Sequence, residues 1–297
     1  MKKTDLDKLA RQFMDNAVKV QPGQNIWIDY VGPNAWPLAE ACFRRTREIG
    51  ANIYLNNSGS ERINAEMAGA SDEQMRAEGQ RLLRLMEQMD GYIRIKDDAN
   101  LEKLALSAEE RQRYDTLLKH EMTEHRVNNT NWLVVNAPTT AFARACGMKK
   151  EAFDQFYRNV CLLDYQSAMA EAVKPLNKLL EQGRKVHIKA PETDLTFRID
   201  DIPAKSCIGA RNIPDGECFT APVKDSINGT ILFGASKYKG ERFDQIKLRF
   251  EDGKAVEAEA RNKDESRNEE RTQKLNEILD TDEGARYVGE FAIAFNP

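Results

Sequence analysis

Hydrophobic residues in the first half of the chain alternate between helical spacing and short strand-like runs. Leu6, Leu9, Phe13 and Ala17 recur every three or four residues, which is typical of the buried face of a helix. Short apolar runs predict four strands, at residues 26–31, 52–55, 91–95 and 132–135. Because helical patterns lie between these runs, we expect parallel strands joined by right-handed crossovers, and helices on both faces of an open sheet.

The next part of the chain predicts helices, and the pattern then changes at Gly183. A charged helix is expected over residues 108–125, and one long helical stretch over residues 153–180. After Gly183, period-two alternation predicts strands at residues 185–189, 194–199, 230–233, 246–250 and 256–259. Glu251–Lys254 is typical of a hairpin turn, and a single helix is expected over residues 266–279.

These two patterns predict an α/β protein with two domains. The first, residues 1–183, is an open parallel-sheet α/β domain, and the second, residues 184–297, is a strand-rich α+β domain. A chain of 297 residues with 41% hydrophobic residues is long enough to build a core in each domain.

Composition narrows the class of partner and the cellular location. The formal net charge is −4, so no global positive field attracts nucleic acid, and we expect no nucleic-acid partner. No apolar window approaches the length of a membrane span and the start has no apolar signal core, so we expect no membrane association. Five scattered cysteines without C-x-x-C spacing favour reduced thiols in a cytoplasmic protein.

The segment Arg211–Pro222 contains the most distinctive candidate site residue, Glu217. Asp-Gly within it indicates a tight turn, and a proline on each side of the turn fixes the backbone further. Glu217 therefore follows a rigid turn directly, where a carboxylate has few conformations and suits metal ligation. From spacing alone, an exposed acid in a surface hairpin is the more common outcome.

Other motifs do not support chemistry of their own. His120 and His125 are five residues apart, whereas a zincin helix needs a spacing of four to aim both rings at one metal. The segment Gly229–Ser236 has the glycine spacing of a phosphate loop but lacks its lysine, and we interpret it as a strand. Cys218 has no histidine near it in sequence, so a packed thiol is favoured over a nucleophile.

Three segments together resemble the aminopeptidase T and aminopeptidase S type metallopeptidases, also called the thermophilic metalloprotease family. These are Arg211–Pro222, a Gly-Glu segment at Asp282–Ala292, and the opening turn Val20–Gln24. The resemblance implies an aminopeptidase that removes N-terminal residues from peptide substrates, uses two divalent metal ions (zinc or cobalt) and forms a homodimer. Carried over by motif, Glu217 and Glu290 are metal ligands, while the catalytic general base stays unassigned.

One departure from the family pattern affects the expected activity. The remaining ligands of the family are histidines and an aspartate, including an H-x-D pair, and they follow the second glutamate. No such pattern follows Glu290 here. We therefore expect the 297 residues to be a truncated aminopeptidase, incomplete as a catalyst. The alternatives are a non-catalytic binding or dimerisation remnant of that family, and a small-molecule-binding α/β protein that uses the first domain.

Overall fold

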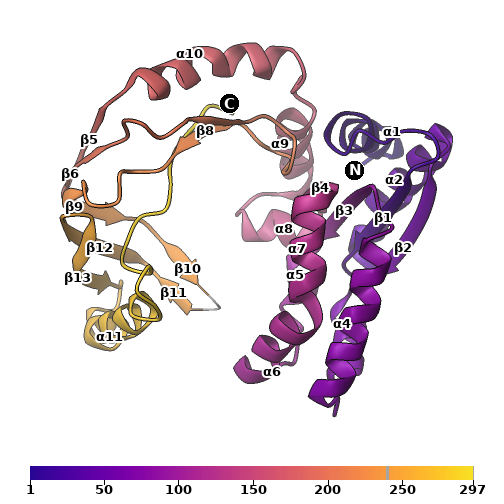
Figure 1. Ribbon diagram of the computed structural model, residues 1–297, viewed down its shortest axis with the longest axis horizontal. Coiled ribbons are helices and arrows are strands. Elements are labelled where there is room, and N and C mark those ends of the chain that lie inside the picture. Colours follow the sequence, from indigo (N-terminus) through magenta and orange to yellow (C-terminus); the bar gives the residue numbers. More distant parts are fainter. Residues whose placement is uncertain (239–240, 297) are drawn as a thin grey trace. The chain divides into compact units, whose positions relative to one another are not determined.

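The computed structural model describes residues 1–238 and 241–296, which form two compact units (Figure 1). The first unit contains residues 1–170, 207–216 and Asn296, and the second contains residues 171–206 and 217–295. The division into 1–183 and 184–297 stays a prediction about independently folding domains. The two units differ from this division in two places: most of the helix that precedes Gly183 belongs to the second unit, and residues 207–216 belong to the first.

The first unit is built on a four-stranded parallel sheet in the order β2-β1-β3-β4. Its strands are β1 (Asn25–Tyr30), β2 (Asn52–Asn57), β3 (Gly91–Lys96) and β4 (Asn131–Asn136). Ile28 of the buried strand β1 pairs with Leu55 on one side and with Ile93 on the other. The predicted parallel α/β sheet is confirmed.

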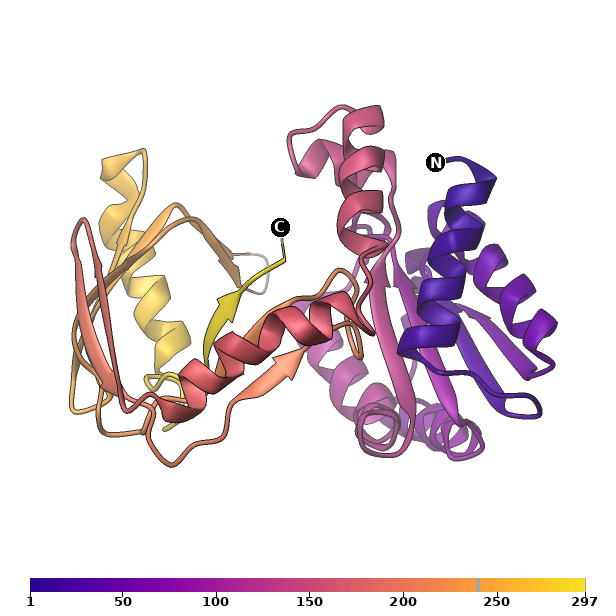
Figure 2. The same cartoon turned by 90° about the horizontal axis from the view of Figure 1, so that it is seen from above.

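Helices cover both faces of this sheet (Figures 1 and 2). The helices of the unit are α1 (Lys3–Arg11), η1 (Gln12–Ala17), η2 (Pro33–Ala35), α2 (Trp36–Ile49), α3 (Ser60–Met67), α4 (Asp72–Met86), α5 (Asp98–Leu101), α6 (Ala108–Arg113), η3 (Tyr114–Lys119), α7 (His120–Asn129), α8 (Thr140–Ala145) and α9 (Lys150–Cys161). Trp27 and Tyr92, register partners on β1 and β3, pack in one core cluster with Leu82 of α4 and Met122 of α7. Strand alternation turns Ile28 toward the opposite face, where α2 and η1 contact the sheet.

The long helical stretch expected over residues 153–180 is wrong, because two helices occupy it. These are α9 and α10 (Ala168–Gln182), separated by residues 162–167. Asp164 accepts a hydrogen bond from the backbone N–H of Ser167 at 2.9 Å, which supports the start of the second helix. Apolar residues continue at helical spacing across the break, so periodicity alone did not reveal it.

The second unit is strand-rich, as predicted. A five-stranded antiparallel sheet has the order β13-β12-β9-β6-β5, a three-stranded sheet has the order β14-β8-β7, and β10 pairs with β11. The strands are β5 (Lys185–Ala190), β6 (Thr193–Arg198), β7 (Lys205–Cys207), β8 (Glu217–Thr220), β9 (Asn228–Phe233), β10 (Ser236–Tyr238), β11 (Glu241–Phe243), β12 (Gln245–Glu251), β13 (Lys254–Arg261) and β14 (Phe291–Ala294). After the short η4 (Glu265–Arg267), α11 (Asn268–Leu279) packs on β13 through Leu275.

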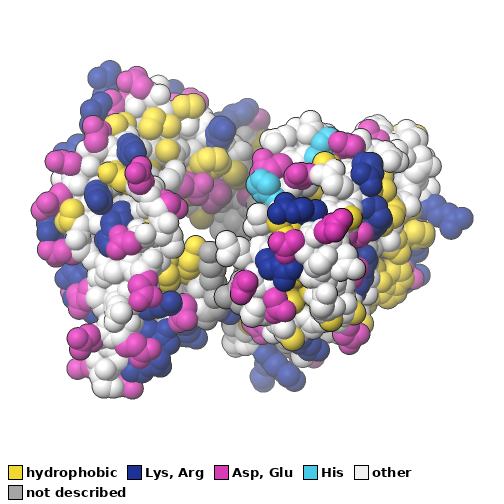
Figure 3. Space-filling view, turned by 60° about the horizontal axis from the view of Figure 1, so that its bottom comes forward, with side chains coloured by type: hydrophobic (Ala, Val, Ile, Leu, Met, Phe, Trp, Pro, Cys, Tyr) yellow, Lys and Arg dark blue, Asp and Glu magenta, His cyan; other side chains and the backbone are white. Residues whose placement is uncertain are grey.

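Charged side chains are spread over the surface that Figure 3 displays, with acidic and basic side chains interspersed. Within residues 1–238 and 241–296, no helix is long and apolar enough to cross a membrane. Cys42, Cys161 and Cys218 are buried, and Cys146 is exposed.

Candidate functional site

The ribbon formed by β8 and β14 carries both predicted metal ligands. The strands are antiparallel, with Ala294 opposite Glu217 and Phe291 opposite Thr220. Glu290 directly precedes β14. Opposed residues share a face of an antiparallel ribbon, so Glu217 and Ala294 lie on the same face, and Glu290 lies just outside the paired residues. Four residues separate Glu290 from Ala294, an offset of roughly 14 Å along the strand.

Burial distinguishes the two faces of this ribbon. Cys218 and Thr220 are buried on one face, whereas Glu217 on the other face is half-buried; Glu290, which precedes the ribbon, is exposed. Neither glutamate side chain has a hydrogen bond or ion pair with any residue that the structure describes. Glu217 is therefore a partly desolvated carboxylate without a protein partner, a state that a bound cation would relieve.

The turn before Glu217 is tied down by hydrogen bonds. The Asp215 carboxylate accepts the backbone N–H of Gly209 at 2.6 Å and that of Gly216 at 2.9 Å. The N–H of Asp215 donates to the hydroxyl of buried Tyr165 at 3.0 Å. Gly216 has a φ of +132°, a conformation that favours glycine. These contacts agree with the rigid Asp-Gly turn expected from the sequence.

The two carboxylates do not complete a metal site by themselves. Among residues 1–238 and 241–296, no group of three or more His, Cys, Asp or Glu side chains is placed to hold a metal ion. His187 instead contacts Asp194 across the exposed β5–β6 pair at 2.6 Å, and His120 and His125 lie on α7. Zinc and cobalt sites normally include nitrogen or sulfur ligands besides carboxylates, so the described residues do not fit a complete dinuclear centre.

Cys218 has the properties of a structural thiol. Its side chain is buried and accepts a hydrogen bond from Asn177 Nδ2, with 3.7 Å between nitrogen and sulfur. Burial raises the pKa of the Cys218 thiol, which keeps it protonated and poorly nucleophilic.

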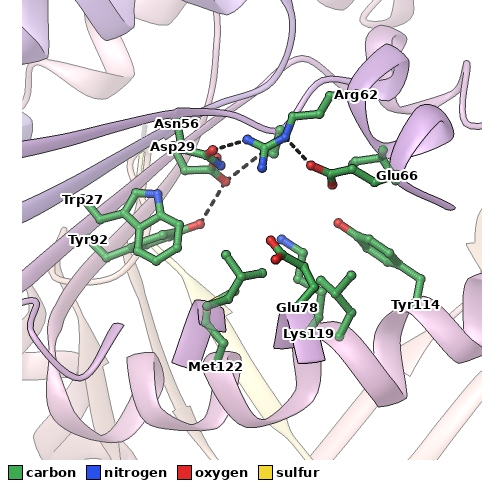
Figure 4. Close-up of a pocket in the computed structure, with 14 residues that line it drawn as sticks. Trp27, Asp29, Asn56, Arg62, Glu66, Glu78, Tyr92, Tyr114, Lys119 and Met122 are labelled. Carbon is green, nitrogen blue, oxygen red and sulfur yellow. Dashed lines mark hydrogen bonds and ion pairs between the residues drawn. The ribbon is translucent and has the colours of Figure 1, made fainter. Parts of the chain in front are cut away.

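A second group of ionisable residues, which the sequence analysis missed, surrounds a pocket in the first unit (Figure 4). Asp29, buried in β1, accepts hydrogen bonds from Ser58 Oγ at 2.9 Å and Tyr92 Oη at 3.0 Å, and it lies 3.3 Å from an Arg94 nitrogen. The sequence did contain a signal for this group, because Asp29 is a charged residue inside the apolar run of residues 26–31. A charge in a buried strand requires polar or charged partners nearby.

Lys119 points into the same pocket from η3 (Figure 4). Its ammonium lies 5.6 Å from the centroid of the Tyr114 ring, and no described carboxylate is within ion-pair distance. Burial lowers the pKa of Lys119 to about 8. The cavity measures about 20 Å³, enough for about one water molecule, so it is too small for a peptide.

Comparison with known protein families shows to which family the chain belongs. Residues 2–297 match the family model described as thermophilic metalloprotease (M29). The chain belongs to this family. Both the segment that contains Glu217 and the segment that contains Glu290 lie inside the matched region.

Curated relatives are aminopeptidases by name. Aminopeptidase 2 of Geobacillus stearothermophilus is 25% identical over an alignment that covers 97% of this chain and 76% of that protein. Aminopeptidase T of Thermus thermophilus is 30% identical, covering 57% of this chain and 46% of that protein. Aminopeptidase AmpS of Bacillus subtilis is 27% identical, with coverage of 44% and 32%.

Solved structures support the fold. Wild-type AmpT from Thermus thermophilus superposes with a TM-score of 0.75 at 22% identity, covering 98% of this chain and 78% of that one. A 2,5-dihydroxypyridine dioxygenase from Pseudomonas putida KT2440 reaches a TM-score of 0.55 at 13% identity, covering 98% and 76%. Because a peptidase and an oxygenase share this architecture, the fold alone does not determine the reaction.

Proposed function

We propose that this chain is a metal-dependent aminopeptidase, or the part of one that supplies two carboxylate ligands, Glu217 and Glu290. The observation that carries the proposal is the half-buried, unpartnered carboxylate of Glu217 on the ribbon that Glu290 directly precedes, within the family match over residues 2–297. Family membership supports peptide bond hydrolysis, and the names of the relatives support action at the N-terminus.

In this proposal each residue has a defined task. Glu217, held by the Asp215 turn, and Glu290, at the entrance to β14, donate carboxylate oxygens to a pair of zinc or cobalt ions. Such ions supply Lewis acidity toward the scissile carbonyl. Two carboxylates do not complete the coordination, so further ligands have to come from residues that the structure does not bring to this pair or from a longer version of the chain. Formation of a homodimer and a cytoplasmic location belong to the same proposal.

The test is aminopeptidase turnover of the 297-residue chain, and of any longer version that its gene encodes, with zinc or cobalt added. Glu217→Gln keeps the volume of the side chain and removes its charge, so we expect at least a hundred-fold lower turnover wherever the parent is active. Glu283→Gln is the matched control, because Glu283 is exposed and belongs to the same Gly-Glu segment.

The outcomes separate the alternatives. Metal-dependent turnover that Glu217→Gln removes and Glu283→Gln preserves supports the aminopeptidase. Inactivity of both lengths with every metal favours the non-catalytic binding or dimerisation remnant. Full activity of Glu217→Gln would exclude this carboxylate as a ligand.

A further inference from the structure

A cavity of about 330 Å³ lies in the first unit at the carboxyl ends of β3 and β4. The last residues of these strands, Lys96 and Asn136, are register partners, and both line the cavity. In open α/β sheets, ligands bind outside the carboxyl ends of the parallel strands. The cavity therefore occupies the position at which this architecture places small-molecule sites.

The wall of the cavity is largely aromatic. Phe142 of α8 and Phe153 of α9 meet edge to face, with ring centroids 5.0 Å apart. Phe156, which is 47% exposed, lies at the opening, and Ile213 contributes from the segment that runs beside β4. That segment is held in place by the N–H of Val134, which donates to the carbonyl of Arg211 at 3.0 Å. The volume and apolar lining are those of small-molecule pockets.

Two polar residues, Asn136 and Lys96, also belong to the lining of the cavity. The Asn136 side-chain oxygen Oδ1 is buried and has no hydrogen-bond partner among the described residues. The backbone carbonyl of Asn136 is occupied, because the Tyr157 hydroxyl donates to it at 2.6 Å. Beside it, Lys96 keeps its ammonium 3.4 Å from Asp98, a loose and solvent-exposed pair that leaves donors available.

We propose that this cavity binds a small zwitterionic molecule with an apolar body, the chemistry of an amino acid with an aromatic or branched side chain. The ligand ammonium donates to Asn136 Oδ1, the ligand carboxylate pairs with Lys96, and the side chain enters the space between Phe142, Phe153 and Phe156. The buried amide oxygen explains the need for a donor, because an unsatisfied polar atom in this setting is costly. The site is independent of the carboxylate pair and of the proposed peptidase activity.

Binding is tested with L-phenylalanine on the whole chain, by calorimetry and by protection of Cys146 from iodoacetamide. Cys146 lines the cavity and is exposed, whereas Cys207, which does not line it, serves as the internal reference thiol. We expect saturable binding of one molecule per chain, and slower alkylation of Cys146 but not of Cys207. The analogues 3-phenylpropionate, which lacks the ammonium, and 2-phenylethylamine, which lacks the carboxylate, are expected to bind at least ten-fold more weakly.

Substitutions of the lining residues test each proposed contact with the ligand. Asn136→Ala and Lys96→Met are each expected to weaken L-phenylalanine binding roughly ten- to a hundred-fold, the change that follows loss of a hydrogen bond to a charged group. Asn136→Asp, which keeps an acceptor, is expected to retain affinity for 2-phenylethylamine. Phe156→Ser is expected to weaken binding, and Leu179→Ser, a matched exposed helix residue on α10, to leave it unchanged.

Any of three results would overturn the proposal. The first is no saturable binding of L-phenylalanine at millimolar concentration. The second is that both analogues bind as tightly as L-phenylalanine, and the third is that neither Asn136→Ala nor Lys96→Met changes the affinity for L-phenylalanine. Circular dichroism spectra identical to those of the parent chain verify that each variant is folded before its affinity is interpreted.

Discussion

Glu217 of β8 stands opposite Ala294 of β14, and Glu290 precedes that partner by four residues, just outside the strand. The four-residue offset corresponds to roughly 14 Å between backbone positions. Metal ions of a dinuclear pair are about 3.5–4 Å apart, so both side chains have to turn toward each other along the ribbon to serve one centre. Glu290 lies outside the ladder hydrogen bonds, which gives its backbone more freedom to do so than that of Glu217.

This arrangement predicts coupled effects on metal binding. If both glutamates contact the same metal pair, Glu217→Gln and Glu290→Gln each lower the affinity for cobalt, and the double variant is less impaired than the sum of the single effects. Titration followed by cobalt absorbance measures the three affinities, with Glu283→Gln as the control. Strictly additive losses would indicate two separate weak sites rather than one.

The strands were predictable because their signals are local. Each end of the four parallel strands lies within two residues of the end of the run that predicted it, and the hairpin turn at Asp252 and Gly253 has the expected positive φ values. The break between α9 and α10 was missed because it depends on one Asp164 hydrogen bond, whereas the apolar spacing continues across it. Periodicity reports the buried face of a segment and not its continuity.

The candidate sites were predictable only in part. Family resemblance suggested Glu217 and Glu290 as candidates, but their relative position follows from the pairing of two strands more than 70 residues apart in sequence, which no local pattern encodes. The same limit applies to Lys96 and Asn136, which are brought together by the β3–β4 pairing. For Asp29 a local signal existed, a carboxylate in a buried strand, although its partners come from β2, β3 and the loop after β2.

Removal of the Asp29 carboxylate is expected to destabilise the first unit. Asp29→Ala leaves Arg94 without its buried partner and two hydroxyls without an acceptor, so we expect the free energy of unfolding to fall by about 3 kcal/mol. All three tryptophans, Trp27, Trp36 and Trp132, belong to the first unit, so tryptophan fluorescence in urea reports on it. Asp115→Ala, at an exposed aspartate of η3, should change stability by less than about 0.5 kcal/mol.

Lys119 is expected to make the stability of the first unit depend on pH in the alkaline range. Its folded-state pKa is lowered to about 8, whereas an unfolded lysine titrates near 10.4. Between these values the unfolded chain binds more protons at this position, so the free energy of unfolding rises with pH across this window. Below about pH 8 both states are protonated and the cost of burying the ammonium is constant.

Lys119→Met isolates this contribution. The variant should melt at a higher temperature than the parent at pH 7, and the difference should shrink as the pH rises from 8 to 10. Lys8→Met, at an exposed lysine of α1, is the control. It removes a positive charge but does not remove the cost of burying an ammonium group. A difference that is the same at pH 7 and pH 10 would show that Lys119 titrates normally in the folded state.

The turn between β12 and β13 tests how closely the second unit is packed. Gly253 and Gly23 have nearly equal φ values, +84° and +80°, but an added Cβ meets the Lys224 carbonyl oxygen at 1.7 Å in the first case and nothing within 4 Å in the second. Gly23→Ala should therefore cost only the left-handed backbone strain, about 1–2 kcal/mol. Gly253→Ala adds a clash with backbone that cannot rotate away, for a total of about 2–5 kcal/mol. Hydrogen exchange resolves the two units, and we expect β9, β12 and β13 to lose protection in Gly253→Ala alone; equal losses in both variants would mean that the Lys224 loop yields to the added methyl group.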